Sequence, residues 1–165
     1  MQTKEAIHSR RSIRQFDGRP VPPGYLEELI DAARMAPTAR NVQPWEFVVV
    51  TRKAALEAMA ELIENARFLS SCGAAIVVLC QDSKYYLEDG CAATVNILLA
   101  AQDLGVSSCW VAGDKKSYCD EIRRMFEVPK GFFLVSIVGL GYSAQADFAV
   151  PAKRALKEVL HWEQW

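Results

Sequence analysis

A short basic stretch near the N-terminus, from Ser9 to Phe16, offers the most specific binding chemistry in the sequence. In an extended backbone successive side chains point to opposite sides, so Arg10, Ser12 and Arg14 share one side. Two guanidinium groups that flank a hydroxyl can hold a phosphate or another anionic edge through bidentate, charge-assisted hydrogen bonds. The stretch is therefore a candidate anion site, although a cluster of this kind, taken alone, is more often just a solvated face.

A second candidate stretch runs from Ala36 to Phe47, between a predicted helix and a predicted strand. It combines small residues, a rigid proline turn and amide side chains that can both donate and accept hydrogen bonds. Such a loop could bind a flat heteroaromatic ring that carries alternating donors and acceptors along its edge. Its composition is also that of a plain turn before a strand.

Histidine is scarce, which limits the catalysis that side chains alone can perform. Only His8 and His161 are present, and no spacing of histidines or carboxylates matches a metal site. Zinc catalysis and serine or cysteine hydrolase chemistry depend on histidine, so the sequence disfavours them. We therefore name no catalytic side chain and no metal.

The segment from Gly139 to Ala144 matches the G-x-G-x-x-A pattern of a dinucleotide-binding turn. That turn works only where it opens a helix within a β-α-β unit, so that the phosphates meet the helix N-terminus. Here an apolar run precedes the glycines and Pro151 follows shortly after them. We interpret the glycines as the end of a strand.

The charge and composition indicate one compact domain. The 165 residues carry 19 Lys and Arg against 20 Asp and Glu, and 51% of them are hydrophobic. A chain so close to neutrality lacks the basic excess of a nucleic-acid-binding protein, and its hydrophobic content argues against a long disordered tail. We expect a single domain spanning residues 1–165, without a nucleic-acid partner.

The five cysteines and the apolar runs predict the compartment. No two cysteines stand in a C-x-x-C pair, so we interpret them as free thiols in a reducing cytoplasm. The N-terminus lacks the apolar stretch of a signal peptide, and the longest charge-free run is interrupted by glycines and too short for a membrane helix. These features predict a cytoplasmic protein with no membrane partner.

Hydrophobic periodicity and turn residues predict the elements that position the two stretches. We expect helices over about residues 4–9, 22–36, 53–65 and 116–126. We expect strands over residues 47–51, 74–80, 108–111 and 132–140.

Two further segments point to a partner subunit. The segment from about Lys84 to Leu104 predicts a long helix, with Gly105 placed for a left-handed C-cap. Its second half is apolar around the whole circumference, so we expect burial on every side, which a second subunit could provide. The tail, about residues 155–165, carries two tryptophans, and we expect it to dock on the partner; packing on its own subunit is the alternative.

Taken together, the two stretches resemble the nitroreductase family of FMN-dependent oxidoreductases, and the resemblance covers nearly the whole chain. The motifs that carry it are Arg10-Arg-Ser-Ile-Arg-Gln-Phe16, Ala36-Pro-Thr-Ala-Arg-Asn-Val-Gln-Pro-Trp45, Leu104-Gly-Val-Ser-Ser-Cys-Trp-Val-Ala-Gly113, Pro151-Ala-Lys-Arg154 and Leu156-Lys-Glu-Val-Leu-His-Trp162. The resemblance implies an α+β fold, a three-layer α/β/α sandwich with a mixed, mainly antiparallel sheet. It also implies an intertwined homodimer whose subunits exchange their C-terminal strands.

The same resemblance implies FMN sites at the subunit interface. Arg10, Ser12 and Arg14, with Arg11 adjacent, would bind the ribityl phosphate and the pyrimidine edge of the flavin. The second stretch would reach the same flavin from the other subunit. The 111–113 segment would place a backbone N–H at the reactive N5 edge of the flavin. Basic residues near the C-terminus would complete the phosphate site. The further cofactor-binding residues implied are Pro37, Thr38, Ala39, Asn41, Asn65, Ala112, Gly113, Lys153 and Arg154.

The implied activity is the reduction of nitroaromatic, quinone or similar acceptors by NADH or NADPH, in a ping-pong cycle through flavin N5. The chain departs from larger family members between Gly113 and Phe132, where it is short, and at Ala112, where some members carry an acidic residue. Both departures bear on the substrate range. Two other interpretations remain: a flavin-binding carrier or sensor without efficient turnover, and a nucleic-acid-binding basic arm.

Overall fold

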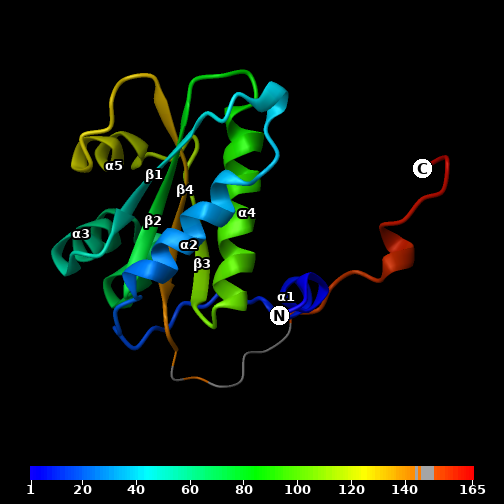
Figure 1. Cartoon of the computed structure of the whole chain (residues 1–165), viewed down its shortest axis with the longest axis horizontal. Coiled ribbons are helices and arrows are strands. Elements are labelled where there is room, and N and C mark those ends of the chain that lie inside the picture. The colour runs from blue at the N-terminus through cyan, green and yellow to red at the C-terminus, as the bar shows by residue number, and fades with distance from the viewer. Residues whose placement is uncertain (144, 146–150) are drawn as a thin grey trace.

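Four strands form the central sheet of the computed structural model, which describes residues 1–143, 145 and 151–165 (Figure 1). Their order is β1-β2-β4-β3, and every pair of neighbours is antiparallel. The four predicted strands are confirmed, and their ends shift by at most two residues. The bounds are β1 Trp45–Val50, β2 Ala74–Gln81, β3 Ser107–Ala112 and β4 Phe132–Gly141.

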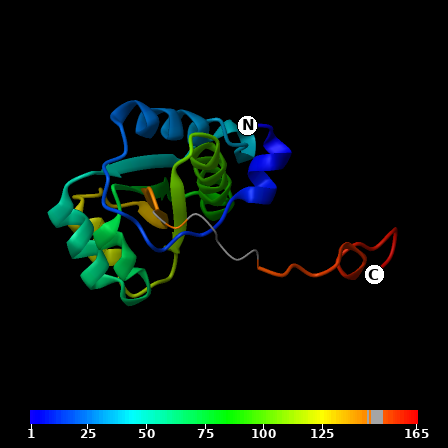
Figure 2. The ribbon, with the colours of Figure 1, turned by 90° about the horizontal axis from the view of Figure 1, so that it is seen from below.

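Helices cover both faces of this sheet and make the three layers that the sequence predicts (Figures 1 and 2). They are α1 Thr3–Ser9, α2 Pro23–Arg34, α3 Lys53–Leu62, α4 Tyr86–Asp103 and α5 Cys119–Met125, with short 3-10 helices η1 Ala39–Asn41, η2 Glu64–Ser71 and η3 Leu156–Glu158. Ile76 and Val78 of β2 pack with α2 and α4, whereas Val77 and Leu79 pack with α3 and α5. The alternation of side chains along one strand thus builds a hydrophobic core on each face.

The N-terminal segment extends the sheet at its β3 edge. Ser12 forms an isolated parallel bridge with Ser108, in which the Ile13 N–H donates to the Ser108 carbonyl at 3.0 Å. Among the described residues, the sheet is therefore antiparallel apart from this parallel bridge. The bridge fixes the predicted anion-binding stretch beside β3. It also confirms the extended backbone there, because Ile13 is buried while Ser12 and Arg14 are exposed.

The glycines between Gly139 and Ala144 lie where the strand interpretation places them. Gly139 and Gly141 are both within β4, and Ala144 lies outside the described residues. A Cβ on Gly139 would come within 3.0 Å of the Cys72 sulfur and of the Leu69 and Phe68 side chains. These glycines therefore serve close packing in the sheet.

Two predicted helices are shorter in the structure. The helix expected over residues 53–65 ends at Leu62, because Ile63 adopts an extended conformation and buries its side chain in the core. The helix expected over residues 116–126 begins only at Cys119. In both places the residues removed from the helix form turns that face a common cavity.

The long helix α4 is confirmed, and the expected cover of its whole circumference by a second subunit stays a prediction. Ala93, Ile97 and Ala101 are fully buried against the sheet and α2, whereas Val95 on another face is 43% exposed. The helix ends as predicted: Gly105 has a φ of 70°, and the Val106 N–H donates to the Ala101 carbonyl at 2.8 Å. The face of α4 around Val95 is thus left partly uncovered by the described residues of its own chain.

The C-terminal tail leaves the body of the molecule (Figures 1 and 2). Every residue from 151 to 165 is exposed, and Trp162 is 79% exposed. The predicted docking of this tail on a partner subunit stays a prediction. Among the described residues no helix is long and apolar enough to cross a membrane.

Candidate functional site

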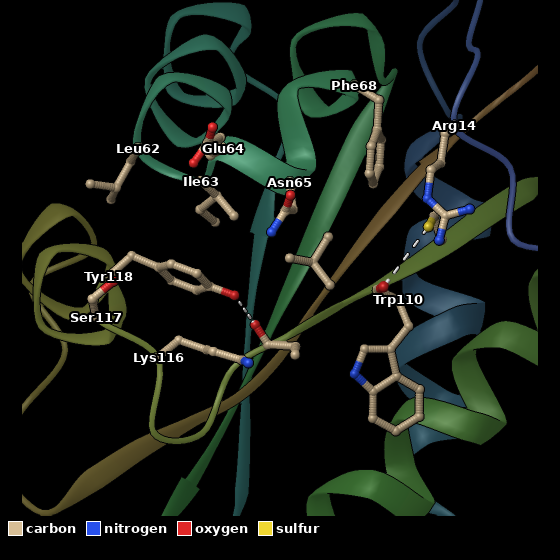
Figure 3. A pocket seen from close by; sticks show the side chains of 13 residues that line it. Arg14, Leu62, Ile63, Glu64, Asn65, Phe68, Trp110, Lys116, Ser117 and Tyr118 are labelled. Carbon is tan, nitrogen blue, oxygen red and sulfur yellow. Dashed lines mark hydrogen bonds between the residues drawn. The ribbon is translucent and has the colours of Figure 1, made fainter.

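A cavity of about 520 Å³ lies along the outer edge of β3 (Figure 3). One wall is the end of α3 with η2, the floor is β3, and the far wall is the turn that leads into α5. Its size is within the usual range for a small-molecule site. The lining residues are Arg14, Leu62, Ile63, Glu64, Asn65, Phe68, Cys109, Trp110, Val111, Ala112, Lys116, Ser117 and Tyr118.

The backbone of β3 turns hydrogen-bond donors toward this cavity. Gly113 donates its N–H to the Val135 carbonyl at 3.0 Å, so Gly113 and alternate residues before it bond to β4. The intervening residues, Ser108, Trp110 and Ala112, direct their N–H and C=O groups away from β4. The bond from Ile13 to the Ser108 carbonyl confirms this direction. The Ala112 N–H therefore faces the cavity edge, whereas the Gly113 N–H is already used.

Gly113 has a packing role that explains why no side chain stands there. A Cβ at this position would lie 2.6 Å from the carbonyl carbon and oxygen of Val135. Only glycine allows β3 and β4 to approach this closely. Of the two sequence-predicted residues at the end of β3, Ala112 lines the cavity and Gly113 supports it from behind.

Two guanidinium groups, of which Arg14 lines the cavity, lie near the cavity residue Cys109, and neither has an acidic partner among the described residues. Arg10 and Arg14 form no ion pair within the part of the chain that the structure describes, and both lie close enough to Cys109 to oppose the rise that burial causes in its thiol pKa. Arg11 behaves differently. Its guanidinium donates to the His8 and Arg10 carbonyls at 2.8 and 2.9 Å. The predicted alternation of side chains is thus observed, and Arg11 lies apart from the other two.

Asn65 and Tyr118 face each other across the cavity (Figure 3). The Asn65 amide, which no described residue hydrogen-bonds, is presented by η2 just after the extended residue Ile63. Tyr118 donates its hydroxyl proton to the Ala112 carbonyl. Burial raises the pKa of the Tyr118 phenol, so it remains protonated and the bond to β3 persists at neutral pH.

The second predicted stretch lies elsewhere in the chain. Thr38 and Ala39 are hydrogen-bonded to Asp89 in the first turns of α4, while Arg11 lines a hollow with Gln102 near the other end of α4. At 1.5 Å per residue, these two points on the helix are about 20 Å apart. Figure 1 places η1 and the N-terminal stretch at opposite ends of α4. Pro37, Thr38, Ala39 and Asn41 therefore do not line the cavity of their own chain.

The two basic residues predicted near the C-terminus are also separate from the cavity. Lys153 and Arg154 belong to the exposed tail, and Arg154 bonds within that tail to the Glu158 carbonyl at 2.6 Å. Of the sequence-predicted residues, Arg14, Asn65 and Ala112 line the cavity, Arg10 lies near its residue Cys109, Ser12 lies on the extended segment beside it, and Gly113 supports it from behind. The rest are held on other surfaces.

The sequence interpretation missed Tyr118 and Asp89. Tyr118 follows a run of charged residues and carries no distinguishing pattern. Asp89 did carry a signal, because an acidic residue at the start of an otherwise apolar helix must find partners if the helix is buried. Its partners, 50 and 51 residues earlier in the chain, could not be identified without the fold.

Comparison with known proteins gives a consistent result. The model of the Nitroreductase family matches residues 7–78 and 80–142. A protein of Archaeoglobus fulgidus, provisionally named an NADH dehydrogenase/NAD(P)H nitroreductase, is 36% identical over 168 residues, which cover 96% of each chain. A Parabacteroides distasonis crystal structure with the same provisional name superposes with a TM-score of 0.93 at 32% identity, covering 100% of this chain and 99% of that one. An FMN-dependent nitroreductase from Clostridium difficile gives a TM-score of 0.89 at 27% identity, covering 98% and 99%.

Proposed function

Because the chain belongs to the nitroreductase family, we propose that it is an FMN-dependent oxidoreductase that transfers electrons from NADH or NADPH to nitroaromatic, quinone or similar acceptors. Membership of this family makes it an oxidoreductase, and the cofactor and acceptors are the parts that we propose. The observation that carries the proposal is the cavity at the edge of β3. There, the Arg14 guanidinium, which pairs with no acidic side chain among the described residues, lies at one end, and the Ala112 N–H, which points away from β4, lies at the other.

The residues around this cavity fit FMN. Arg10 and Arg14, with the exposed Ser12 between them, provide charge-assisted donors for a phosphate or for the pyrimidine edge. Asn65 can donate to or accept from the polar edge of the ring. The Ala112 N–H supplies a donor at the opposite end. Neutral aromatic and aliphatic side chains, Phe68 and Val111, cover the space between them.

The bound FMN would supply the hydride chemistry, which none of the lining side chains can perform. The residues of the chain would position the flavin and polarise it. Arg14 would place a fixed positive charge beside the bound flavin, and a preorganised charge of this kind stabilises developing negative charge without rearrangement. Tyr118 donates its hydroxyl proton to the Ala112 carbonyl, and this bond would keep the end of β3 in place beside a bound flavin. Phe68, packed on Phe16 with ring centroids 6.0 Å apart, would give the bound flavin an apolar contact on one side.

We propose that two chains complete each site. The Pro37–Asn41 segment and the basic tail lie away from the cavity of their own chain, so a partner must bring them to it. Thr38, Ala39 and Asn41 of one chain and the tail with Lys153 and Arg154 would join the cavity at the interface of a homodimer. The partly exposed face of α4, with Val95, and the exposed tail residue Trp162 supply apolar surface for that interface.

Steady-state kinetics test the proposed turnover. We expect the FMN-loaded protein to oxidise NADH or NADPH with a quinone or a nitroaromatic acceptor. The nicotinamide nucleotide and the acceptor would use the same slot in turn. Double-reciprocal plots of rate against nucleotide concentration, measured at several acceptor concentrations, should therefore give the parallel lines of a ping-pong cycle. A protein that binds FMN stoichiometrically but shows no turnover with either nucleotide would contradict the proposal and favour a flavin carrier or sensor.

A further inference from the structure

We propose that Asp89 is a positioning residue that locks the Thr38–Gln43 loop in the conformation that reaches the cofactor of the partner subunit. This inference rests on the proposed function, because it concerns the loop that would complete the FMN site from the second chain. It reassigns Thr38 from a cofactor contact to a part of the lock.

The lock consists of three hydrogen bonds. Thr38 donates its hydroxyl proton to Asp89 Oδ2 at 2.7 Å, and the Ala39 N–H donates to Asp89 Oδ1 at 3.2 Å. The Gln43 N–H donates to the Thr38 hydroxyl oxygen at 3.1 Å. Both carboxylate oxygens are therefore engaged by the loop, and the single proton of the Thr38 hydroxyl is used within the chain.

The loop needs such a lock because its backbone is strained. Arg40, Asn41 and Gln43 have φ values of 55°, 56° and 52°, in the left-handed region that a Cβ disfavours. Asparagine tolerates this region better than arginine or glutamine does. Strained conformations of this kind persist only where the surrounding contacts over-determine them, and they concentrate at functional sites.

The burial of Asp89 and its position in α4 suit it to accept hydrogen bonds from the loop. Its side chain is buried, with 5% of its surface exposed, and it lies in the first turns of α4, where the helix dipole favours a negative charge. No described residue forms an ion pair with it, so its hydrogen-bonding capacity serves the loop. A buried carboxylate with unsatisfied oxygens is costly, which makes the lock reciprocal: the loop satisfies Asp89, and Asp89 fixes the loop.

The lock determines what the loop can present. With Thr38 and the Ala39 N–H turned toward Asp89, the exposed residues of the loop are Arg40, Asn41, Val42 and Gln43. Of Thr38, Ala39 and Asn41, the loop residues implied at this site, Asn41 is thus the one with an exposed polar side chain. The loop acts as a rigid arm, and its rigidity comes from a residue that touches no ligand.

Hydrogen exchange on the apoprotein tests the lock without any cofactor. In Asp89→Asn the side chain keeps its shape but has one acceptor oxygen, so one of the two donors is left facing an NH₂ group. We expect the amides of Ala39 and Gln43 to exchange at least about tenfold faster than in the wild type, because one charge-assisted bond is lost. The control Glu88→Gln removes a charge from the same turn and should leave both amides protected. Unchanged exchange in Asp89→Asn would overturn the proposal.

A double-mutant cycle on FMN affinity links the lock to the site. We expect Asp89→Asn and Thr38→Val each to weaken FMN binding by about tenfold, and the double variant to bind no more weakly than either single one, because both break the same lock. Multiplying effects would mean that Thr38 contacts the cofactor directly, and would overturn the reassignment. Thr38→Ser, which keeps the hydroxyl, should restore wild-type affinity.

The two experiments separate this inference from the proposed function. If the wild-type protein binds no FMN, the proposed function fails, while the exchange result still decides whether the lock exists. If the wild type binds FMN and Asp89→Asn binds it equally well, only the inference fails. Should Asp89→Asn prove unfolded by urea titration, the Thr38→Val and Thr38→Ser pair gives the same comparison from a surface loop.

Discussion

Replacing Arg14 with glutamine tests the anion end of the cavity most cleanly. Arg14 lines the cavity, pairs with no acidic side chain among the described residues, and shares the neighbourhood of Cys109 with Arg10. Its guanidinium is therefore available to a ligand. Since no ion pair is broken in the apoprotein, the substitution should leave folding nearly unchanged and act on binding.

The magnitude follows from the number of bonds that are lost. A hydrogen bond to a charged group contributes about 1.5–3 kcal/mol, and each 1.4 kcal/mol is about a factor of ten in affinity. Loss of one such bond from Arg14 should raise the Kd for FMN by about 10- to 150-fold. The remaining affinity should also depend less on salt, because one screened charge has been removed.

Arg11→Gln is the matched control, because it removes the same charge from a residue three positions away. The Arg11 guanidinium bonds to the His8 and Arg10 carbonyls and lines a hollow with Gln102, so it lies apart from the cavity. Its loss should change the Kd for FMN by less than about threefold and lower stability by about 1 kcal/mol. Titration of each variant apoprotein with FMN, followed by flavin fluorescence, measures the Kd. Urea titration measures the stability. Equal weakening by the two substitutions would refute the assignment, since it would reflect only net charge.

Three further predictions concern stability and assembly. Gly113→Ala should destabilise the fold by at least about 2 kcal/mol in urea titration, because the new Cβ meets the Val135 backbone. The control Gly24→Ala, in open space on α2, should stabilise the fold by about 0.5–1 kcal/mol. Equal effects of the two substitutions would contradict the packing argument. Burial raises the pKa of both Cys72 and Cys80 to about 12 from an ordinary value of 9.0. Above pH 9 the folded chain therefore keeps thiol protons that the unfolded chain releases. The free energy of unfolding should fall there by up to about 1.4 kcal/mol per pH unit for each thiol. Urea titration at pH 8 and pH 10.5 checks this, and replacing both thiols by alanine should flatten the fall. Deleting residues 155–165 should shift the protein from dimer to monomer in sedimentation velocity, and an unchanged dimer would exclude the tail from the interface.

Much of the fold could be predicted from local patterns, because the patterns and the tertiary contacts agree. The β2 run Ala74–Cys80 is apolar without interruption, and the structure buries it from both faces. Gly105 follows an apolar helix and adopts the left-handed conformation of a C-cap. The pairing order of the strands could not be predicted from local patterns, because the paired residues of β2 and β4 lie about 60 positions apart in the sequence.

The site was predictable where side chains alternate along an extended segment, and less so where turns decide direction. Arg10 and Arg14 lie on one side of their strand and Arg11 on the other, as period-two geometry requires. The end of β3 needed the structure, because hydrogen bonding with β4 decides that Ala112 exposes its N–H and Gly113 does not. Asn65 lies in a 3-10 helix, since Ile63 ends α3 early to reach the core. No periodicity in the sequence marks that choice.

The visible absorbance spectrum of the purified protein tests the central claim most directly. After reconstitution with FMN and gel filtration, we expect flavin bands to remain with the protein at about one FMN per chain, to bleach on anaerobic addition of NADH or NADPH, and to be released as FMN on denaturation. A protein that emerges colourless from the same treatment, while remaining folded, would contradict the assignment of the β3-edge cavity as a flavin site.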